Sequence, residues 1–244
     1  FCGGTHCRDV RMTTRFHEDN VNDAIGSTMH ESGHGIYEQG LLFEHVGTQM
    51  GQAVSLGIHE SQSRMWENQV GRSKAFWKWC YPKLSEYFGD ATSSLSFDDV
   101  YGGANIVRPD FIRVEADEAT YNMHVMIRFE LERLIMKGDL AVADIPDAWN
   151  QLYKEYLGIQ VSSDTEGCLQ DVHWSMASMG YFPTYTLGNL YCAQFFEKAM
   201  EEIPDMYEQF ESGEFGALKT WLNENIHCHG KRYRAADLCE VVTG

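Results

Sequence analysis

The helix that decides the fold is encoded by residues 22–39, NDAIGSTMHESGHGIYEQ. Val21, Ile25 and Met29 recur at steps of four residues, which places their side chains on one inward-facing side. Gly40 follows as the expected C-terminal cap, because glycine readily adopts the left-handed conformation that ends many helices. The pattern therefore predicts an amphipathic helix rather than a strand.

The rest of the chain has the same helical character. Five prolines and few alternating polar and apolar residues favour long helices over strands. The clearest apolar stripe lies on a predicted helix from Phe111 to Lys137, which Gly138 should end. Residues 158–181 lack a helical period and are rich in polar residues and glycine, so we expect an ordered loop there. The other predicted helices cover 52–81 with an interruption near Gly71, 146–157, 184–202 and 215–227.

The composition predicts one all-α globular domain over residues 1–244. Hydrophobic residues make up 43% and charged residues 23%, as in folded soluble proteins. The net charge of −17 gives no positive field for phosphate backbones, so we expect no nucleic-acid partner. No apolar run is long enough to span a bilayer, so we expect no membrane partner. Seven cysteines without paired spacing favour a reducing, cytoplasmic location over a disulfide framework.

Metal chemistry is predicted by HESGH at residues 30–34, an H-E-x-x-H sequence. His30 and His34 are four residues apart on a helix, so both imidazoles can reach one metal ion. Glu31 is predicted to act as general base, taking a proton as water activated by the metal attacks a carbonyl carbon. Chance produces this pattern only about 0.03 times in a chain of this composition, and two ordinary helix histidines are the simpler alternative.

A catalytic zinc ion needs a third protein ligand and one open position. Glu60 lies on the next predicted helix, and an antiparallel turn of the chain would bring it back across the two histidines. Spacing alone gives Glu60 a moderate advantage over His45 or His59. The remaining helix-borne candidates are Glu38, Glu44 and Glu67.

Five motifs follow one another along the chain. They are DVRMT at 9–13, HESGH at 30–34, HESQ at 59–62, IRVEAD at 112–117 and GCLQDVHW at 167–174. Together they resemble the signatures of the carboxypeptidase Taq family of zinc metallocarboxypeptidases, and the resemblance extends through YFPTYTLGN at 181–189. It implies an all-α, cleft-type zincin fold similar to neurolysin and angiotensin-converting enzyme.

The resemblance also implies an activity and a ligand set. Family members release single amino acids from peptide C-termini with broad specificity, and are typically cytosolic homodimers. The likeness selects Glu60 as third ligand beside His30 and His34, with one Zn²⁺ per chain and Co²⁺ as a plausible substitute. Because members are about twice as long, the chain resembles a C-terminal part, and both ends look like cuts through a longer protein. The alternatives are an endopeptidase or dipeptidase on the same scaffold, or an inactive zinc-binding fragment.

Several motif residues are predicted to bind substrate. Arg113 offers a guanidinium fork for the terminal carboxylate of a peptide, and the alternative is an internal ion pair with Asp117 on the same predicted helix. His173 is predicted to donate a hydrogen bond to the substrate, or else to be bonded within its own loop. Tyr181 and Tyr185 are candidates to stabilise an oxyanion, although core packing explains them almost as well. The residues expected to support the site from nearby are Asp9, Arg11, His59, Gln62, Asp117 and Asp171.

Overall fold

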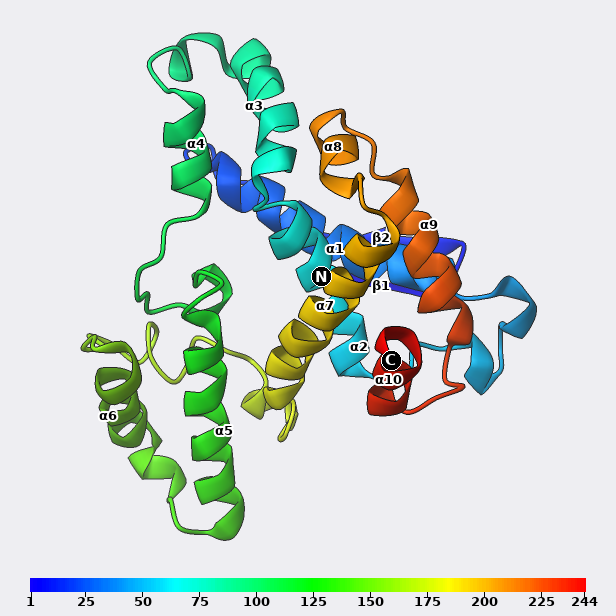
Figure 1. Ribbon diagram of the computed structural model, residues 1–244. Helices are drawn as coiled ribbons and strands as arrows, with labels where there is room; N and C mark the ends of the chain where they lie inside the picture. Colours follow the sequence, from blue (N-terminus) through cyan, green and yellow to red (C-terminus); the bar gives the residue numbers. More distant parts are fainter. The chain divides into compact units, whose positions relative to one another are not determined.

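A computed structural model gives a mostly helical chain with two compact units (Figure 1). It describes the backbone of residues 1–244 and every side chain except that of Thr5. The first unit comprises residues 1–105 and 187–244, and the second comprises residues 106–186. The prediction of an all-α fold is confirmed, while a single catalytic domain over 1–244 stays a prediction.

The first unit holds most of the helices and the short hairpin. Its helices are α1 (Val21–Gly40), α2 (Leu56–Arg64), α3 (Lys74–Phe88), α4 (Phe97–Ala104), most of α7 (Pro183–Glu202), α8 (Met206–Glu211), α9 (Gly216–Asn225) and α10 (Ala235–Thr243). A π-helix, Met65–Val70, follows α2 directly. The helix is then interrupted at residues 71–73 before α3 begins, close to the predicted interruption at Gly71. The hydrophobic core of this unit includes Tyr37, Ile58, Met65, Phe195, Phe196, Phe210 and Leu222.

An antiparallel hairpin near the start of the chain was not predicted. Strand β1 (Cys2–His6) pairs with β2 (Asp9–Met12), with Cys2 opposite Met12 and Gly3 opposite Arg11. Both strands contact α1. Two strands of four or five residues carry too little alternation to stand out in a sequence, and their position on a helix surface is a tertiary effect.

Helix α1 begins at Val21, where the Asn20 side chain accepts a hydrogen bond from the backbone of the first turn. The predicted left-handed cap at Gly40 is wrong, because Gly40 is the last helical residue and Leu41 follows in an extended conformation. Glycine is needed there for space instead. A Cβ at this position would lie 2.3 Å from His227 Nδ1.

The long helix predicted over 111–137 is shorter in the structure. Helix α5 spans Tyr121–Lys137, and Gly138 ends it with a φ of 79°, as predicted. Asp117 explains the later start, because its Oδ1 accepts hydrogen bonds from the backbone N–H groups two and three residues further on. Such local bonds offer the backbone an alternative to a helical turn. The apolar period therefore continues into a segment that is not α-helical.

The second unit is built around α5 and α6 (Ile145–Leu157), which lie side by side (Figure 1). The polar segment 158–181 is irregular apart from one 3₁₀ turn, Trp174–Met176, which confirms the predicted loop. The main core of this unit consists of Ile127, Leu131, Trp149, Tyr153, Leu157 and Val161. Across the described residues of both units, no helix combines the length and apolar character needed to cross a bilayer.

Helices α1 and α2 approach each other most closely at Gly33. A Cβ there would lie 2.6 Å from both the Gln62 carbonyl oxygen and the Ser63 Cα. Because these are backbone atoms, they cannot swing aside as the end of a flexible side chain does. The short distance between the two helices is what brings the histidines of α1 next to the side chains of α2.

Replacing Gly33 by alanine is therefore expected to destabilise the first unit by about 1–3 kcal/mol through overpacking. Gly26→Ala on the same helix is the matched control, since nothing lies within 4 Å of a Cβ there. Alanine should stabilise α1 at that position by roughly 0.5–1 kcal/mol. Urea unfolding of the two variants measures the difference, and equal stabilities would contradict the close helix contact.

Candidate metal centre

Three predicted ligands meet in the first unit. His30 and His34 come from α1 and Glu60 from α2, and their ligand atoms all lie within 4.8 Å of one another. Glu60 Oε2 is 3.9 Å from His30 Nε2 and 3.5 Å from His34 Nε2. Two imidazoles and one carboxylate with a fourth position open are the donor set of a catalytic zinc site.

The outer nitrogens of both histidines are already bonded, which is the arrangement that metal ligands require. His30 Nδ1 lies 2.8 Å from Glu67 Oε2, and His34 Nδ1 lies 2.6 Å from His59 Nδ1. Partners of this kind hold a ligating imidazole in one orientation and leave the other ring nitrogen to the metal. The residues present therefore fit a divalent metal ion.

Glu60 is oriented from two directions. Arg64 donates from Nε to Glu60 Oε1 at 3.0 Å, which leaves Oε2 as the oxygen that faces the histidines. On the other side, a Cβ at Gly188 of α7 would lie 2.6 Å from the Glu60 Cβ, so α7 packs directly on the ligand. Arg64 also donates from Nη1 to Glu67 Oε2 at 3.1 Å and so links the carboxylate ligand to the partner of His30.

Charge in this buried group favours ionised carboxylates. Burial raises the pKa of Glu60, but His30, His34 and Arg64 outweigh that effect and hold it well below its usual range. Burial also raises the pKa of Glu67, while Arg64 and His30 bring it down to about 2. Both side chains are therefore anionic at neutral pH.

The two histidines respond differently to the same surroundings. Burial lowers the pKa of His34 more than Glu60 raises it, so the neutral form is favoured. Burial also lowers the pKa of His30, but Glu60 and Glu67 more than reverse this and raise it above 6.5. A proton consequently competes with a metal ion more strongly at His30 than at an ordinary histidine.

Metal affinity should therefore fall in acid, because a ligating imidazole must be neutral. Since the pKa of His30 is raised, the loss should begin above pH 6.5 and then reach about tenfold per pH unit while one proton competes. Competition with a chromogenic chelator from about pH 8 down to pH 5.5 measures this slope. An affinity that stays constant across this interval would contradict His30 as a ligand.

Glu31 lies beside His30 in the sequence but is not part of the ligand cluster found among the described residues. Its Oε1 is 2.7 Å from the amino nitrogen of Phe1, and its Oε2 is buried with no hydrogen-bond partner. A buried carboxylate oxygen without a partner is uncommon and is available to a further group. Its role as general base stays a prediction.

The supporting residues predicted in the first unit have different surroundings. Asp9 and Arg11 form an ion pair of 2.8 Å on β2, and Arg11 is 80% exposed. His59 contacts His34, as described above. Gln62 is fully buried and its Oε1 lies 2.9 Å from His227 Nε2, so it joins α2 to the segment after α9.

Arg113 does not pair with Asp117, so that part of the sequence interpretation is wrong. It lies in the 3₁₀ turn Arg113–Glu115, outside α5, while Asp117 accepts its bonds from backbone groups and from Thr120. Arg113 instead donates from Nη2 to Asp171 Oδ1 at 2.7 Å. Arg128 donates from Nε to Asp171 Oδ2 at 2.6 Å.

Asp171 thus lies between two buried guanidinium groups of the second unit. Arg113 is 4% exposed and Arg128 is fully buried. Burial raises the pKa of Asp171, but the two arginines outweigh this and lower it to about 2. Gln170 completes the group, because its Oε1 accepts from Arg113 N–H and from Arg128 Nη2. Sequence reasoning gave no role to Gln170, although it belongs to the GCLQDVHW motif.

The four predicted substrate-binding residues lie together in the second unit. His173 Nε2 is 3.0 Å from the Tyr185 hydroxyl oxygen, and the rings of His173 and Tyr181 are 5.1 Å apart. The Arg113 guanidinium lies 4.6 Å from the centre of the Tyr185 ring. His173 Nδ1 is buried and has no hydrogen-bond partner. Burial and Arg113 lower the pKa of His173, so it is neutral at pH 7.

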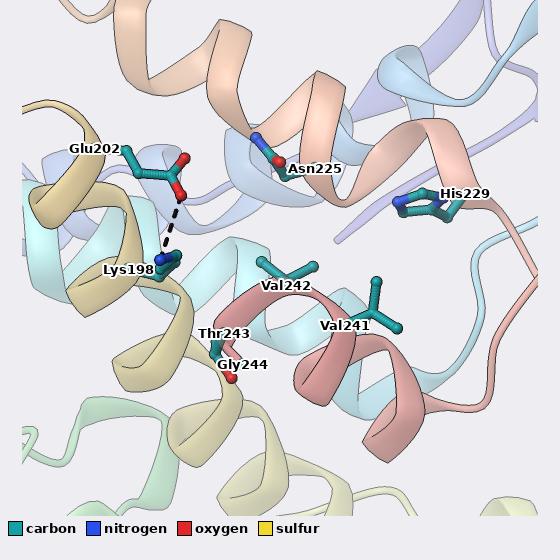
Figure 2. A pocket seen from close by; sticks show the side chains of 8 residues that line it. All are labelled: Lys198, Glu202, Asn225, His229, Val241, Val242, Thr243 and Gly244. Atoms are coloured by element: carbon teal, nitrogen blue, oxygen red, sulfur yellow. Dashed lines mark ion pairs between the residues drawn. The ribbon is translucent and has the colours of Figure 1, made fainter.

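A cavity of about 370 Å³ in the first unit offers no comparable chemistry. Figure 2 shows its lining between α7, α9 and α10, with an ion pair between Lys198 and Glu202 at one side. Its other lining residues are Asn225, His229, Val241, Val242, Thr243 and Gly244. None of the lining residues is a member of the ligand cluster, so the metal centre is the stronger candidate site.

Comparison with known proteins shows the family of the chain. A family model described as carboxypeptidase Taq (M32) metallopeptidase matches residues 1–244. Thermostable carboxypeptidase 1 of Thermus thermophilus is 50% identical over 236 residues, which cover 97% of this chain and 46% of that protein. Carboxypeptidase 1 of Bacillus subtilis is 46% identical over 236 residues, covering 97% and 47% respectively.

Solved structures give the same result for the fold. The M32 carboxypeptidase from Deinococcus radiodurans R1 matches with a TM-score of 0.96 at 44% identity, covering 100% of this chain and 49% of that one. A Pyrococcus furiosus carboxypeptidase matches with a TM-score of 0.95 at 45% identity, covering 99% and 48%. The high TM-scores confirm the predicted fold class. The coverages show that the chain spans about half the length of the relatives it matches.

Proposed function

Because the chain belongs to the carboxypeptidase Taq (M32) family of metallopeptidases, we propose that the protein acts as a zinc metallocarboxypeptidase. It would hydrolyse the last peptide bond of a peptide and release single amino acids. The observation that carries the proposal is the group of His30, His34 and Glu60, with both outer histidine nitrogens bonded and Glu31 next to His30 in the sequence.

The residues divide the chemistry between them. His30, His34 and Glu60 would hold Zn²⁺, with Co²⁺ as a substitute, and the ion when bound supplies the Lewis acidity that activates water and polarises the carbonyl. Glu31 accepts a proton from the attacking water at Oε2, the oxygen that lacks a partner. The same carboxyl group then passes the proton to the departing amine.

We propose that the group around Arg113 and Asp171 attracts the C-terminal end of the peptide. Two guanidinium groups share the single carboxylate of Asp171, which leaves positive charge in excess within that group. A chain with a net charge of −17 needs such a local cation to attract an anionic terminus. Because the nitrogens of Arg113 already bond Asp171 and Tyr121, we propose that it acts through its charge and by orienting His173 and Tyr185.

Product analysis tests the proposed activity in the full-length, zinc-loaded protein. Mass spectrometry should show removal of one residue at a time from a peptide with a free C-terminus and much slower cleavage of the same peptide with an amidated end. Internal cuts in both peptides would instead identify an endopeptidase. No cleavage of either peptide would overturn the enzymatic proposal.

We also propose that the full-length protein is a cytoplasmic homodimer that acts on peptides. The seven cysteines of the sequence show no paired spacing, which favours a reducing compartment. Light scattering of the full-length protein after size-exclusion chromatography measures the oligomeric state directly.

A further inference from the structure

The two histidine ligands are supported in different ways. His30 Nδ1 meets the Glu67 carboxylate directly at 2.8 Å. His34 Nδ1 has no carboxylate next to it among its described contacts and meets the ring of His59 instead, at 2.6 Å between the two Nδ1 atoms. A second imidazole can either donate or accept a hydrogen bond at this position. By itself it therefore does not fix which of the two rings is the donor.

The far side of the His59 ring ends on a carboxylate. His59 Nε2 lies 2.8 Å from Glu38 Oε1, and Glu38 is four residues after His34 on α1. The three groups form a row of hydrogen bonds from His34 on α1 to His59 on α2 and from there to Glu38 on α1. The centres of the His34 and His59 rings are 4.7 Å apart, and Tyr37 of α1 packs edge-on against the His59 ring.

The donor and acceptor in each of these hydrogen bonds follow from the protons that each group carries. A carboxylate only accepts hydrogen bonds, so the short contact with Glu38 requires a proton on His59 Nε2. A neutral His59 then has a bare Nδ1, which can only accept, and its partner His34 must carry its own proton on Nδ1. The consequence is a bare His34 Nε2, the atom that faces Glu60 at 3.5 Å.

We propose that Glu38 and His59 are positioning residues that fix the tautomer of His34 and so prepare its Nε2 for the metal ion. The inference rests on the proposed metal site. A carboxylate thus determines which ring nitrogen carries the proton in each ligand. Glu67 contacts His30 directly, whereas Glu38 acts on His34 through the ring of His59.

Nitrogen-15 NMR of histidine side chains in the metal-free, full-length protein tests the tautomers without any activity measurement. The expected spectrum at about pH 7.5 shows the proton of His34 on Nδ1 and that of His59 on Nε2. A proton on His34 Nε2, or protons on both nitrogens of His59, would overturn the proposal. This result holds whether or not zinc binds, so it separates the inference from the proposed metal site.

Zinc affinity gives the second measurement, by competition with a chelator. Glu38→Ala removes the final acceptor, and we expect about tenfold weaker binding together with loss of the single His34 tautomer. Glu38→Gln removes the charge but keeps an acceptor oxygen, so its affinity should lie between those of Glu38→Ala and the unchanged protein.

Glu44→Ala is the matched control, because it removes an equal charge from a largely exposed glutamate that contacts only His45 among its described ion pairs. Its zinc affinity should stay within about twofold of the unchanged protein. Equal effects of Glu38→Ala and Glu44→Ala would mean that only charge matters and would overturn the positioning role. If the unchanged chain binds no zinc at all, the metal proposal fails and the NMR tautomers alone decide the inference.

Discussion

Replacing Glu31 by glutamine is expected to lower kcat of the full-length, zinc-loaded protein by about 10²–10⁴-fold while its zinc content stays at one equivalent. Glutamine keeps the size and hydrogen-bonding reach of the side chain but cannot take a proton from water. Glu31 lies outside the ligand cluster, so its replacement should leave the three metal donors in place. Steady-state kinetics and metal analysis of the same sample measure both quantities.

Glu60→Ala is the control with the opposite expected pattern, since it removes a ligand and should lose the metal together with the activity. Loss of zinc from Glu31→Gln would make Glu31 a ligand, and retained activity would exclude it as the base.

Replacing Asp171 by alanine is expected to destabilise the second unit by about 3–5 kcal/mol. The change leaves the buried guanidinium groups of Arg113 and Arg128 without their shared carboxylate. Removing one partner of a buried ion pair is costly because the remaining charge is neither solvated nor compensated. Urea unfolding, followed by tryptophan fluorescence to which the core residue Trp149 of this unit contributes, measures the loss.

Acid should also lower the stability of the second unit in the unchanged protein, by part of the amount that Asp171→Ala removes. The pKa of Asp171 is lowered from 3.8 to about 2, so its contribution is complete above pH 3.8 and disappears as the pH falls toward 2. The shift corresponds to roughly 2 kcal/mol. Asp171→Ala should lack this component of the acid dependence. Asp164→Ala, in the exposed part of the same loop, is the control and should cost less than about 0.5 kcal/mol; equal losses for both variants would contradict the buried cluster.

The cluster of candidate metal ligands could be predicted from the sequence because the geometry of its two histidines is local. His30 and His34 share a helical face wherever that helix forms, and the motif resemblance identified Glu60 before any distance was known. The same local reasoning failed for Arg113. Four residues separate it from Asp117, but that spacing makes an ion pair only on a helix, and Asp117 lies before α5, where it bonds the backbone instead.

Partners that come from distant segments could not be predicted. Asp171 is 58 residues from Arg113, and only the folded loop brings them together. Glu38 and Glu67 were both considered as metal ligands from the sequence, but in the structure each bonds a histidine instead. Spacing indicates which side chains can reach a region, whereas the choice between ligand and partner depends on how α1 crosses α2.

The π-helix Met65–Val70 has a consequence for how this site can change during evolution. Its turns hold more residues than α-helical turns, and such segments occur often at functional sites. Removing one residue ahead of Glu67 would let the segment return to regular winding and would change the direction in which Glu67 points relative to α2. Glu67 would then leave His30, although every residue of the recognised motifs was intact. An insertion or deletion of one residue ahead of Glu67 is therefore expected to separate Glu67 from His30, and a motif search alone would not detect it.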